Sequence, residues 1–520
     1  MPIPVIDLFA GPGGLGEGFS SIHNRRGDPI FKIGLSIEKD LNARRTLVLR
    51  AFFRQFRRGE VPENYYDYLA GGISREELWS NHRAESKLAD QEAWHAELGG
   101  ESTPDQLIDE RISQALAERR DWLLIGGPPC QAYSVVGRSR VIGGKGLEKY
   151  EADPRHGLYR HYLRIIQKHR PAVFVMENVK GLLSAKIGQK KTFDRILADL
   201  RHPESAINGR SNCNSELEYR LFPLAPRNAD LFDVAKQEDF LVRAEEHGIP
   251  QSRHRVIIVG IRGDIGSKPR PLIRHGSGLG VEAIIGDLPR IRSGLSRESD
   301  SAEAWIEVVQ AAAGSEWIKP GALPVKVARE IKAALHDLKR NTGCGAEFIR
   351  HRRAPTALRD WFGDDRLKGV TNHSSRSHMA ADLHRYLFAA SFAKAMGRTP
   401  FLGDFPDAIL PDHGNIAESL ENKKFKDRFR VQLGDRPATT VVSHISKDGH
   451  YFIHYDPSQC RSLTVREAAR LQTFPDNYHF EGVRTEQYRQ VGNAVPPLLA
   501  RQIAEVVAEI FGLGYERVQC

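Results

Sequence analysis

The chain has 520 residues, more than one ordinary hydrophobic core accommodates, so we expect two domains. Its formal net charge of +9 and pI near 9.2 suit a polyanionic partner such as nucleic acid, although basic runs are often only solvated surface. No apolar run reaches the roughly 18 residues that a membrane span needs, and the start lacks the features of a signal peptide, so we expect a cytoplasmic protein.

The first half of the chain alternates short apolar segments with amphipathic ones. We expect strands at 3–9, 31–38, 122–127, 172–179 and 256–261, and helices at 19–26, 157–170 and 192–200. Alternation of this kind is typical of βαβ units. The sequence therefore predicts an α/β fold with a doubly wound, mainly parallel, Rossmann-like sheet.

Changes in composition divide the chain further. Residues 41–120 are charged and helix-prone and resemble an insertion in a first domain that covers 1–262. Beyond Gly263, glycine, proline and arginine become frequent and the periodicity is patchy, which indicates a second, irregular domain over 263–482. A C-terminal segment, 483–520, contains an apolar-faced helix entered through two prolines.

The stretch DLFAGPGGLGEGF follows the first expected strand. Gly11, Gly13 and Gly16 satisfy the pattern G-x-G-x-x-G, and Glu38 follows at the distance of an acid that binds ribose hydroxyls. The pattern fits a dinucleotide, an adenosine-bearing methyl donor, or a tight turn that binds nothing. The loop contains no Lys or Arg, and the ring of Phe9 could face a cation, which favours a sulfonium such as S-adenosyl-L-methionine over a pyrophosphate.

The stretch GGPPCQAYS places Cys130 on a proline-rich loop just beyond the carboxyl end of a strand. Ligands of open α/β sheets bind at this edge, so Cys130 is a candidate nucleophile, although many lone cysteines are buried and inert. The five cysteines include no CxxC pair, so neither a disulfide framework nor a metal site is expected; they are Cys130, Cys213, Cys344, Cys460 and Cys520.

Two further polar groups stand at strand ends. Glu177 and Asn178 follow the apolar run AVFVM, where a carboxyl group can act as a proton donor or can be an ordinary loop acid. Arg253 and Arg255 alternate in QSRHR and therefore project to one side of an extended segment. They could face an anion or a carbonyl group, or form a surface pair.

The order of these blocks, followed by RSLTVREAARLQTFPD and GNAVPP, resembles that of the cytosine-C5 DNA methyltransferases. The resemblance implies that Cys130 attacks C6 of cytosine, that Glu177 acts at N3, and that Asn178 helps to hold Glu177. It also implies that Arg255 reaches O2 and that Arg253 supports the catalytic loop or the pocket. Because C6 is inaccessible in a stacked duplex, the cytosine must be flipped out.

The resemblance implies S-adenosyl-L-methionine as cofactor and double-stranded DNA as substrate, with 263–482 as the target-recognition domain. The implied cofactor contacts are Phe9, Gly11, Gly13, Gly14, Leu15, Gly16, Glu38, Pro128, Asn493 and Val495. The stretch WHAELGGESTPDQL offers no clean match to the acid that meets the adenine amine in this family. We expect a monomeric modification enzyme with a cognate restriction endonuclease as a functional partner.

Three alternatives remain open. An NAD-dependent oxidoreductase fits the glycine loop and Glu38 but leaves the other blocks unexplained. An RNA cytosine-C5 methyltransferase keeps the chemistry and changes the substrate, although such proteins generally lack so large a second domain. A DNA-binding protein that has lost catalysis would have no reason to retain Cys130, Glu177 and both arginines.

Overall fold

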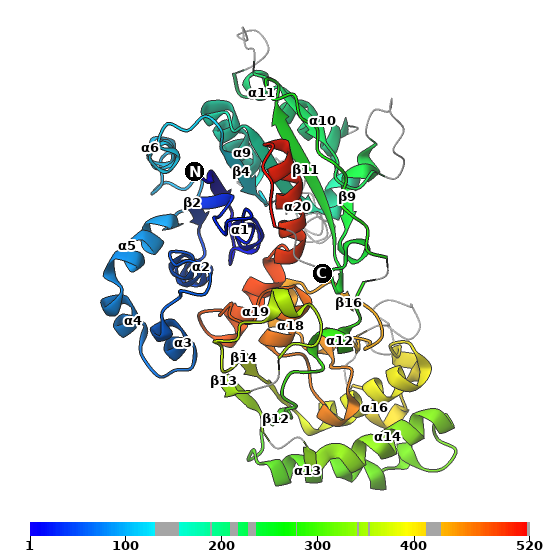
Figure 1. Cartoon of the computed structure of the whole chain (residues 1–520). Coiled ribbons are helices and arrows are strands. Elements are labelled where there is room, and N and C mark those ends of the chain that lie inside the picture. Colours follow the sequence, from blue (N-terminus) through cyan, green and yellow to red (C-terminus); the bar gives the residue numbers. More distant parts are fainter. Residues whose placement is uncertain are drawn as a thin grey trace.

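The computed structural model describes residues 1–129, 155–187, 190–208, 217–226, 236–276, 278–340, 343–351, 354–411 and 428–516. An eight-stranded sheet with the order β3-β2-β1-β4-β5-β11-β8 forms its centre, and β9 also pairs with β11 (Figure 1). Its strands are β1 (Ile3–Leu8), β2 (Phe31–Glu38), β3 (Ala93–His95), β4 (Leu123–Gly126), β5 (Val173–Val179), β8 (Tyr219–Phe222), β9 (Leu241–Arg243) and β11 (His254–Arg262).

Five strands, from β3 to β5, run parallel, whereas β11 is antiparallel to β5, β8 and β9. Apolar side chains alternate between the two faces of the sheet, as the pleat of a strand requires. In β1, Val5 packs into a cluster on one face of the sheet that contains Phe19 and Ile503, and Ile6 packs into a cluster on the other face that contains Ile108 and Tyr162. The predicted α/β fold is therefore confirmed.

The helices of the first half occupy both faces and one edge of the sheet. They are α1 (Gly14–Ser20), α2 (Leu41–Phe53), α3 (Glu63–Leu69), α4 (Arg75–Asn81), α5 (Arg83–Glu92), α6 (Asp105–Leu116), α9 (Arg155–His169), α10 (Thr192–Arg201) and α11 (Pro203–Asn208). The helix expected at 19–26 instead begins at Gly14 and ends at Ser20. Glycine is required at position 18 of this helix because α20 (Pro497–Ile510) packs so closely that a Cβ on Gly18 would lie 2.4 Å from Ala500 Cβ.

The stretch 41–120 contributes to the sheet itself. Strand β3 lies within it and pairs in parallel with β2, and α6 leads from β3 to β4. Helices α3 to α5 precede β3 and form a separate group beside the sheet, in blue in Figure 1, around an apolar cluster that includes Phe52, Tyr65 and Leu78. The sequence pattern does not predict this strand, because β3 has only three residues and follows a charged helical run.

The region 263–482 contains short pairs of strands and a second apolar core. Its strands are β12 (Gly294–Leu295), β13 (Gly345–Arg350), β14 (Gly369–Ser374), β15 (Ser377–His378) and β16 (Ala438–Thr439), the last paired with β10 (Gln251–Ser252). The core gathers around Trp305, Leu387 and Phe388. Its helices are α12 (Val281–Ile285), α13 (Ala302–Gln310), α14 (Val325–Asp337), α15 (Arg359–Phe362), α16 (Ala380–Met396) and α18 (Val465–Leu471).

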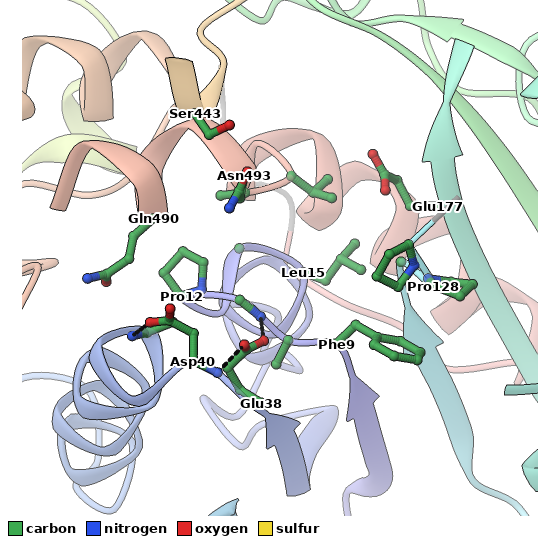
Figure 2. A pocket seen from close by; sticks show the side chains of 18 of the residues that line it. Phe9, Pro12, Leu15, Glu38, Asp40, Pro128, Glu177, Ser443, Gln490 and Asn493 are labelled. Atoms are coloured by element: carbon green, nitrogen blue, oxygen red, sulfur yellow. Dashed lines mark hydrogen bonds between the residues drawn. The ribbon is translucent and has the colours of Figure 1, made fainter. Parts of the chain in front are cut away.

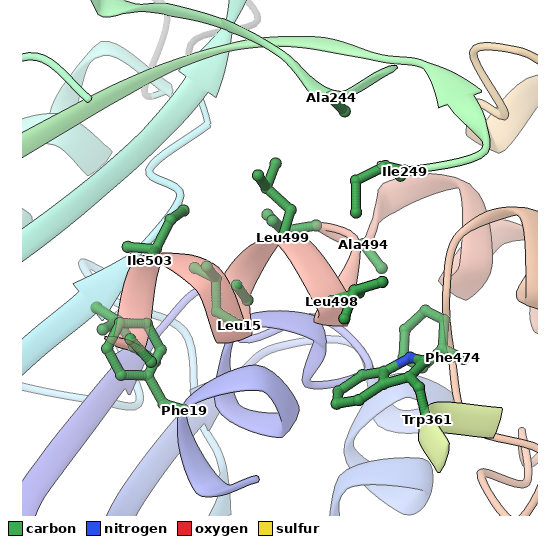
Figure 3. Packing of buried hydrophobic residues seen from close by; sticks show 14 of the residues in the cluster. Leu15, Phe19, Ala244, Ile249, Trp361, Phe474, Ala494, Leu498, Leu499 and Ile503 are labelled. Atoms are coloured by element: carbon green, nitrogen blue, oxygen red, sulfur yellow. The ribbon is translucent and has the colours of Figure 1, made fainter. Parts of the chain in front are cut away.

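The C-terminal helices return to the sheet. After α19 (Arg484–Asn493), α20 (Pro497–Ile510) packs against α1, so that Leu498 and Ile503 lie beside Leu15 and Phe19 in one cluster (Figure 3). None of the described helices combines the length and the apolar character needed to cross a membrane.

Candidate active site

A cavity of about 440 Å³ lies at the carboxyl ends of β1, β2, β4 and β5 (Figure 2). This is the edge at which open α/β sheets bind ligands. The cavity is lined by residues drawn from 9–15, 37–43, 96–98, 127–129, 177–179, 253–255, 442–443 and 489–495, together with Leu158. Segments from the whole length of the chain therefore form one site.

The glycine loop has the backbone that its sequence requires. Gly13 precedes α1 with φ of 94°, a conformation that side chains other than glycine rarely adopt. A Cβ on Gly14 would lie 2.2 Å from the carbonyl oxygen of Val495, so this glycine lets the C-terminal segment close over the loop. Among the predicted cofactor contacts, the cavity is lined by Phe9, Gly11, Gly14, Leu15, Glu38, Pro128, Asn493 and Val495, whereas Gly13 and Gly16 shape the loop behind it.

Glu38 is anchored at the end of β2. The amide of Gly11 donates to Glu38 Oε2 at 2.8 Å, and the amide of Asp40 donates to Oε1 at 2.7 Å. Burial raises the pKa of this carboxyl, and the two amide donors oppose the increase. Figure 2 shows Glu38 between the glycine loop and the first turn of α2, where remaining lone pairs can accept hydroxyl groups from a ligand.

Asp7 is buried beneath the glycine loop, and burial raises its pKa to about 8, although Arg54 opposes this increase. The pKa of Asp7 is higher in the folded protein than in the unfolded chain. The free energy of unfolding therefore decreases as pH rises from about 4 to 8, by at most about 1.4 kcal/mol per pH unit. We expect Asp7→Asn, which cannot ionise, to lose less stability over this range. Urea unfolding of both proteins at pH 5, 6.5 and 8 measures the difference, and identical pH slopes would contradict it.

Glu177 and Arg255 form an ion pair on the opposite wall of the cavity. Strands β5 and β11 place them together, and Arg255 Nε lies 2.7 Å from Glu177 Oε1 with each side chain 13% exposed. A Cβ on Gly127 would lie 2.9 Å from Glu177 Oε2, so this glycine leaves room for the carboxylate. The pair presents an acid and a hydrogen-bond donor side by side to any ligand in the cavity.

Asn178 holds the beginning of the proline loop. Its Nδ2 donates to the carbonyl oxygen of Pro128 at 3.0 Å, and its Oδ1 accepts from the amide of Val179 at 2.9 Å. These contacts join the end of β5 to the loop that follows β4. Cys130, two positions beyond Pro128, lies outside the described residues, so its predicted role as nucleophile stays a prediction.

Arg253 is buried and does not face solvent. It donates to the carbonyl oxygens of Val441 at 2.8 Å and Gly492 at 3.3 Å, and its burial, with Arg255 nearby, lowers its pKa well below the usual value. The amide of Val441 in turn donates to Gln251 Oε1 at 2.8 Å. Arg253 therefore joins the strand that carries Arg255 to two later segments of the cavity wall.

The structure adds cavity residues that the sequence did not reveal. Ala96, Glu97 and Leu98 line the cavity directly after β3, and Glu97 forms an ion pair with Lys39 at 3.0 Å. The rule that functional residues follow parallel strands would have found them if β3 had been recognised. Further additions from segments that pack over the loop are Lys39, Asp40, Ala43, Val442, Ser443, Arg489 and Gln490.

Comparisons with known proteins are consistent with one another. The family described as C-5 cytosine-specific DNA methylase matches residues 100–203 and 238–509. The type II methyltransferase M.Bpa9945I of Bacillus paralicheniformis is 33% identical over 97% of this chain and 98% of its own length. The type II methyltransferase M.AgeI of Thalassovita gelatinovora is 28% identical over 74% of this chain and 82% of its own length.

Among solved structures, one from an E. coli prophage, described as that of a DNA modification methyltransferase, aligns with 98% of this chain and 99% of its own. The two share 17% sequence identity, with a TM-score of 0.47.

Proposed function

Because the chain belongs to the C-5 cytosine-specific DNA methylase family, we propose that it methylates C5 of a cytosine flipped out of a specific duplex DNA sequence. The methyl donor in this proposal is S-adenosyl-L-methionine. The observation that carries the proposal is the cavity itself, in which the Glu177–Arg255 pair faces the same space as the glycine loop and Glu38. One cavity is thus lined both by the residues proposed to hold the donor and by those proposed to hold the cytosine.

The residues of the cavity fit this donor, which supplies an electrophilic methyl group on a sulfonium. Glu38 would accept the ribose hydroxyls, and Phe9 and Leu15 would pack against the uncharged parts. Asn493 and Val495 would enclose the methionine part from the C-terminal segment. The loop 9–16 offers glycine where close approach is needed and no cation that would repel a sulfonium.

Glu97 supplies an acid on the adenine side. It follows the third strand of the parallel sheet and lines the cavity, as does the neighbouring Leu98. In the family that the sequence resembles, an acid after this strand commonly meets the adenine amine. We therefore assign that contact to Glu97, whose ion pair with Lys39 is exposed to solvent and can rearrange at little cost.

In the cytosine half, the thiolate of Cys130 would add to C6 and make C5 nucleophilic. Addition places negative charge on the ring, which Glu177 would neutralise by donating a proton or a hydrogen bond at N3 while Arg255 donates to O2. C5 then takes the methyl group as the sulfur–methyl bond of the donor breaks, which leaves a neutral thioether. Transfer of the C5 proton to a base, return of any N3 proton to Glu177 and expulsion of the Cys130 thiolate restore the double bond and release 5-methylcytosine.

Duplex DNA as substrate is supported by the names of the relatives and by the net charge of +9. Residues 263–482, with a core of their own around Trp305 and Phe388, would supply the groove contacts that choose the sequence. We propose that the enzyme is the cytoplasmic modification component of a restriction-modification system. In that role it would act as a monomer that protects DNA from a cognate endonuclease.

Methyl transfer from labelled S-adenosyl-L-methionine tests the proposal, with unmethylated duplex DNA and transfer RNA as separate substrates and Cys130→Ala beside the wild type. We expect mass spectrometry to find 5-methyldeoxycytidine in DNA only, and only when Cys130 is present. Label in RNA alone would mean that RNA, and not duplex DNA, is the substrate. Equal label with Cys130→Ala would exclude the covalent route.

A further inference from the structure

Helix α3 makes a polar contact with a loop that lies far along the chain. The hydroxyl of Tyr66 donates to Asp364 Oδ2 at 2.8 Å, across 298 positions of sequence. Asn477 Nδ2 donates to the same oxygen at 2.7 Å. Tyr66 is buried, and burial together with Asp364 raises its pKa, so the hydroxyl remains a donor at any physiological pH.

Arg366 reaches back from this loop to the turn before α3. Its guanidinium donates to the carbonyl oxygens of Val61 and Gly59, forms an ion pair with Glu63 at 3.0 Å, and lies 4.7 Å from the ring centroid of Tyr66. A planar cation that satisfies two carbonyl groups, a carboxylate and a ring fixes orientation more strictly than one ion pair does. We call the set Glu63, Tyr66, Asp364, Arg366 and Asn477 the α3 clamp.

Other residues of α3, together with one residue of α4, add to the contact between these helices and the later part of the chain. The hydroxyl of Tyr65 donates to the carbonyl oxygen of Asn477 at 3.0 Å, and that of Tyr68 donates to Glu481 Oε1 at 2.5 Å. Arg75 lies 3.7 Å from the same carboxylate. The group of helices beside the sheet is therefore joined at several points to the segments around 364 and 477.

The clamp joins helix α3, which belongs to the first part of the chain, to the region 263–482. On one side, α3 follows α2, whose first turn lines the cavity through Asp40 and Ala43. On the other side, the loop 363–368 leads directly into β14, which pairs with β13. Figure 1 shows helices α2 to α5 along the side of the molecule that joins the sheet to these strands.

Methylation requires the two parts to be aligned. Groove contacts select a sequence while the flipped cytosine must fit between Glu177 and Arg255. A recognition region that is already held in register with the cavity binds the target DNA with a smaller ordering cost. We propose that Tyr66 and Arg366 are positioning residues for DNA recognition. Through the α3 clamp they hold the reading surface in register with the cavity. This inference rests on the proposed function of 263–482 as the recognition region.

The test compares Arg366→Ala and Tyr66→Phe with Asp67→Asn, an exposed position on the same helix. Once sequencing of methylated DNA has identified the target, kcat and KM are measured for the target duplex and for a duplex with one base pair changed. For Arg366→Ala we expect the ratio of kcat/KM between the two duplexes to fall about tenfold. KM for the target should rise by a similar factor.

The same variant should keep kcat at saturating DNA and the cofactor dissociation constant within about twofold, because Asp40 and the glycine loop are untouched. Tyr66→Phe, which removes one hydroxyl, should change the discrimination ratio in the same direction by about threefold, and Asp67→Asn should not change it. If Arg366→Ala does not fold, Tyr66→Phe decides the question alone.

Unchanged discrimination and KM in both variants would overturn the proposal. An equal loss of kcat and cofactor affinity would also overturn it, since the clamp would then support the cofactor site. A wild type that methylates no DNA would refute the proposed function itself, whereas an active wild type with unaffected variants would refute only the positioning role.

Discussion

Glu177→Gln is expected to lower kcat for methyl transfer by about 10²- to 10³-fold, because in the proposed mechanism this carboxyl group neutralises the charge that develops on the ring when the thiolate adds. The amide can still donate a hydrogen bond but cannot transfer a proton at neutral pH. Arg255, whose Nε lies 2.7 Å from this carboxyl group and whose side chain is only 13% exposed, would also lose its side-chain partner. Single-turnover methylation of duplex DNA at saturating cofactor measures the chemical step separately from product release.

Glu177→Ala separates the two contributions of this carboxyl, since it removes the hydrogen bond as well and should be slower still. Glu246→Gln is the matched control, because Glu246 is partly exposed and pairs with Arg243 outside the cavity. A Glu177→Gln enzyme within fivefold of the wild-type rate would show that charge on the ring is neutralised by another group. Arg255 would then be the first residue to examine.

Gly14→Ala is expected to destabilise the folded chain by about 3 kcal/mol, at the upper end of the usual cost of overpacking. The added methyl group would lie 2.2 Å from the carbonyl oxygen of Val495 and 3.2 Å from its amide nitrogen. Backbone cannot move aside as a flexible side chain can, so the C-terminal segment must separate from the loop. Urea unfolding measures the loss, and isothermal calorimetry should show weaker cofactor binding because Asn493 and Val495 move with that segment.

Gly266→Ala is the control for this substitution. Its Cβ would meet no atom within 4 Å, and a change of at most about 0.5 kcal/mol is expected. Wild-type stability and cofactor affinity in Gly14→Ala would mean that the wall formed by 493–495 is not needed to close the site.

The sequence predicted those parts of the site that follow long strands or contain glycine patterns. Glu38, Glu177 and the loop 9–16 were identified in this way because strand ends converge at one edge of a sheet. Glu97 was not identified, since a three-residue strand after charged helices leaves no periodic signal. Val442 and Ser443 could not be identified either. They reach the cavity through bonds of Arg253 and Gln251 to Val441, 188 and 190 positions away, and such contacts have no local pattern.

The sequence was similarly uninformative for the region 263–482. Its patchy periodicity predicts irregular structure without locating any element, and the structure has short paired strands there. The α3 clamp had no sequence signal, because Tyr66, Asp364 and Asn477 belong to three separate segments, and only the folded chain brings them together.

The packing of α20 on α1 has a consequence for synthesis of the protein. The glycine loop leaves the ribosome long before Asn493 and Val495, which complete its cavity, because about 480 residues separate them. At a synthesis rate of about 5 to 20 residues per second, roughly 25 to 100 s pass between synthesis of the loop and synthesis of residues 493–495. A nascent chain that has not yet reached these residues, or a chain truncated before them, therefore lacks the closed cavity, and we expect only chains that contain them to modify DNA.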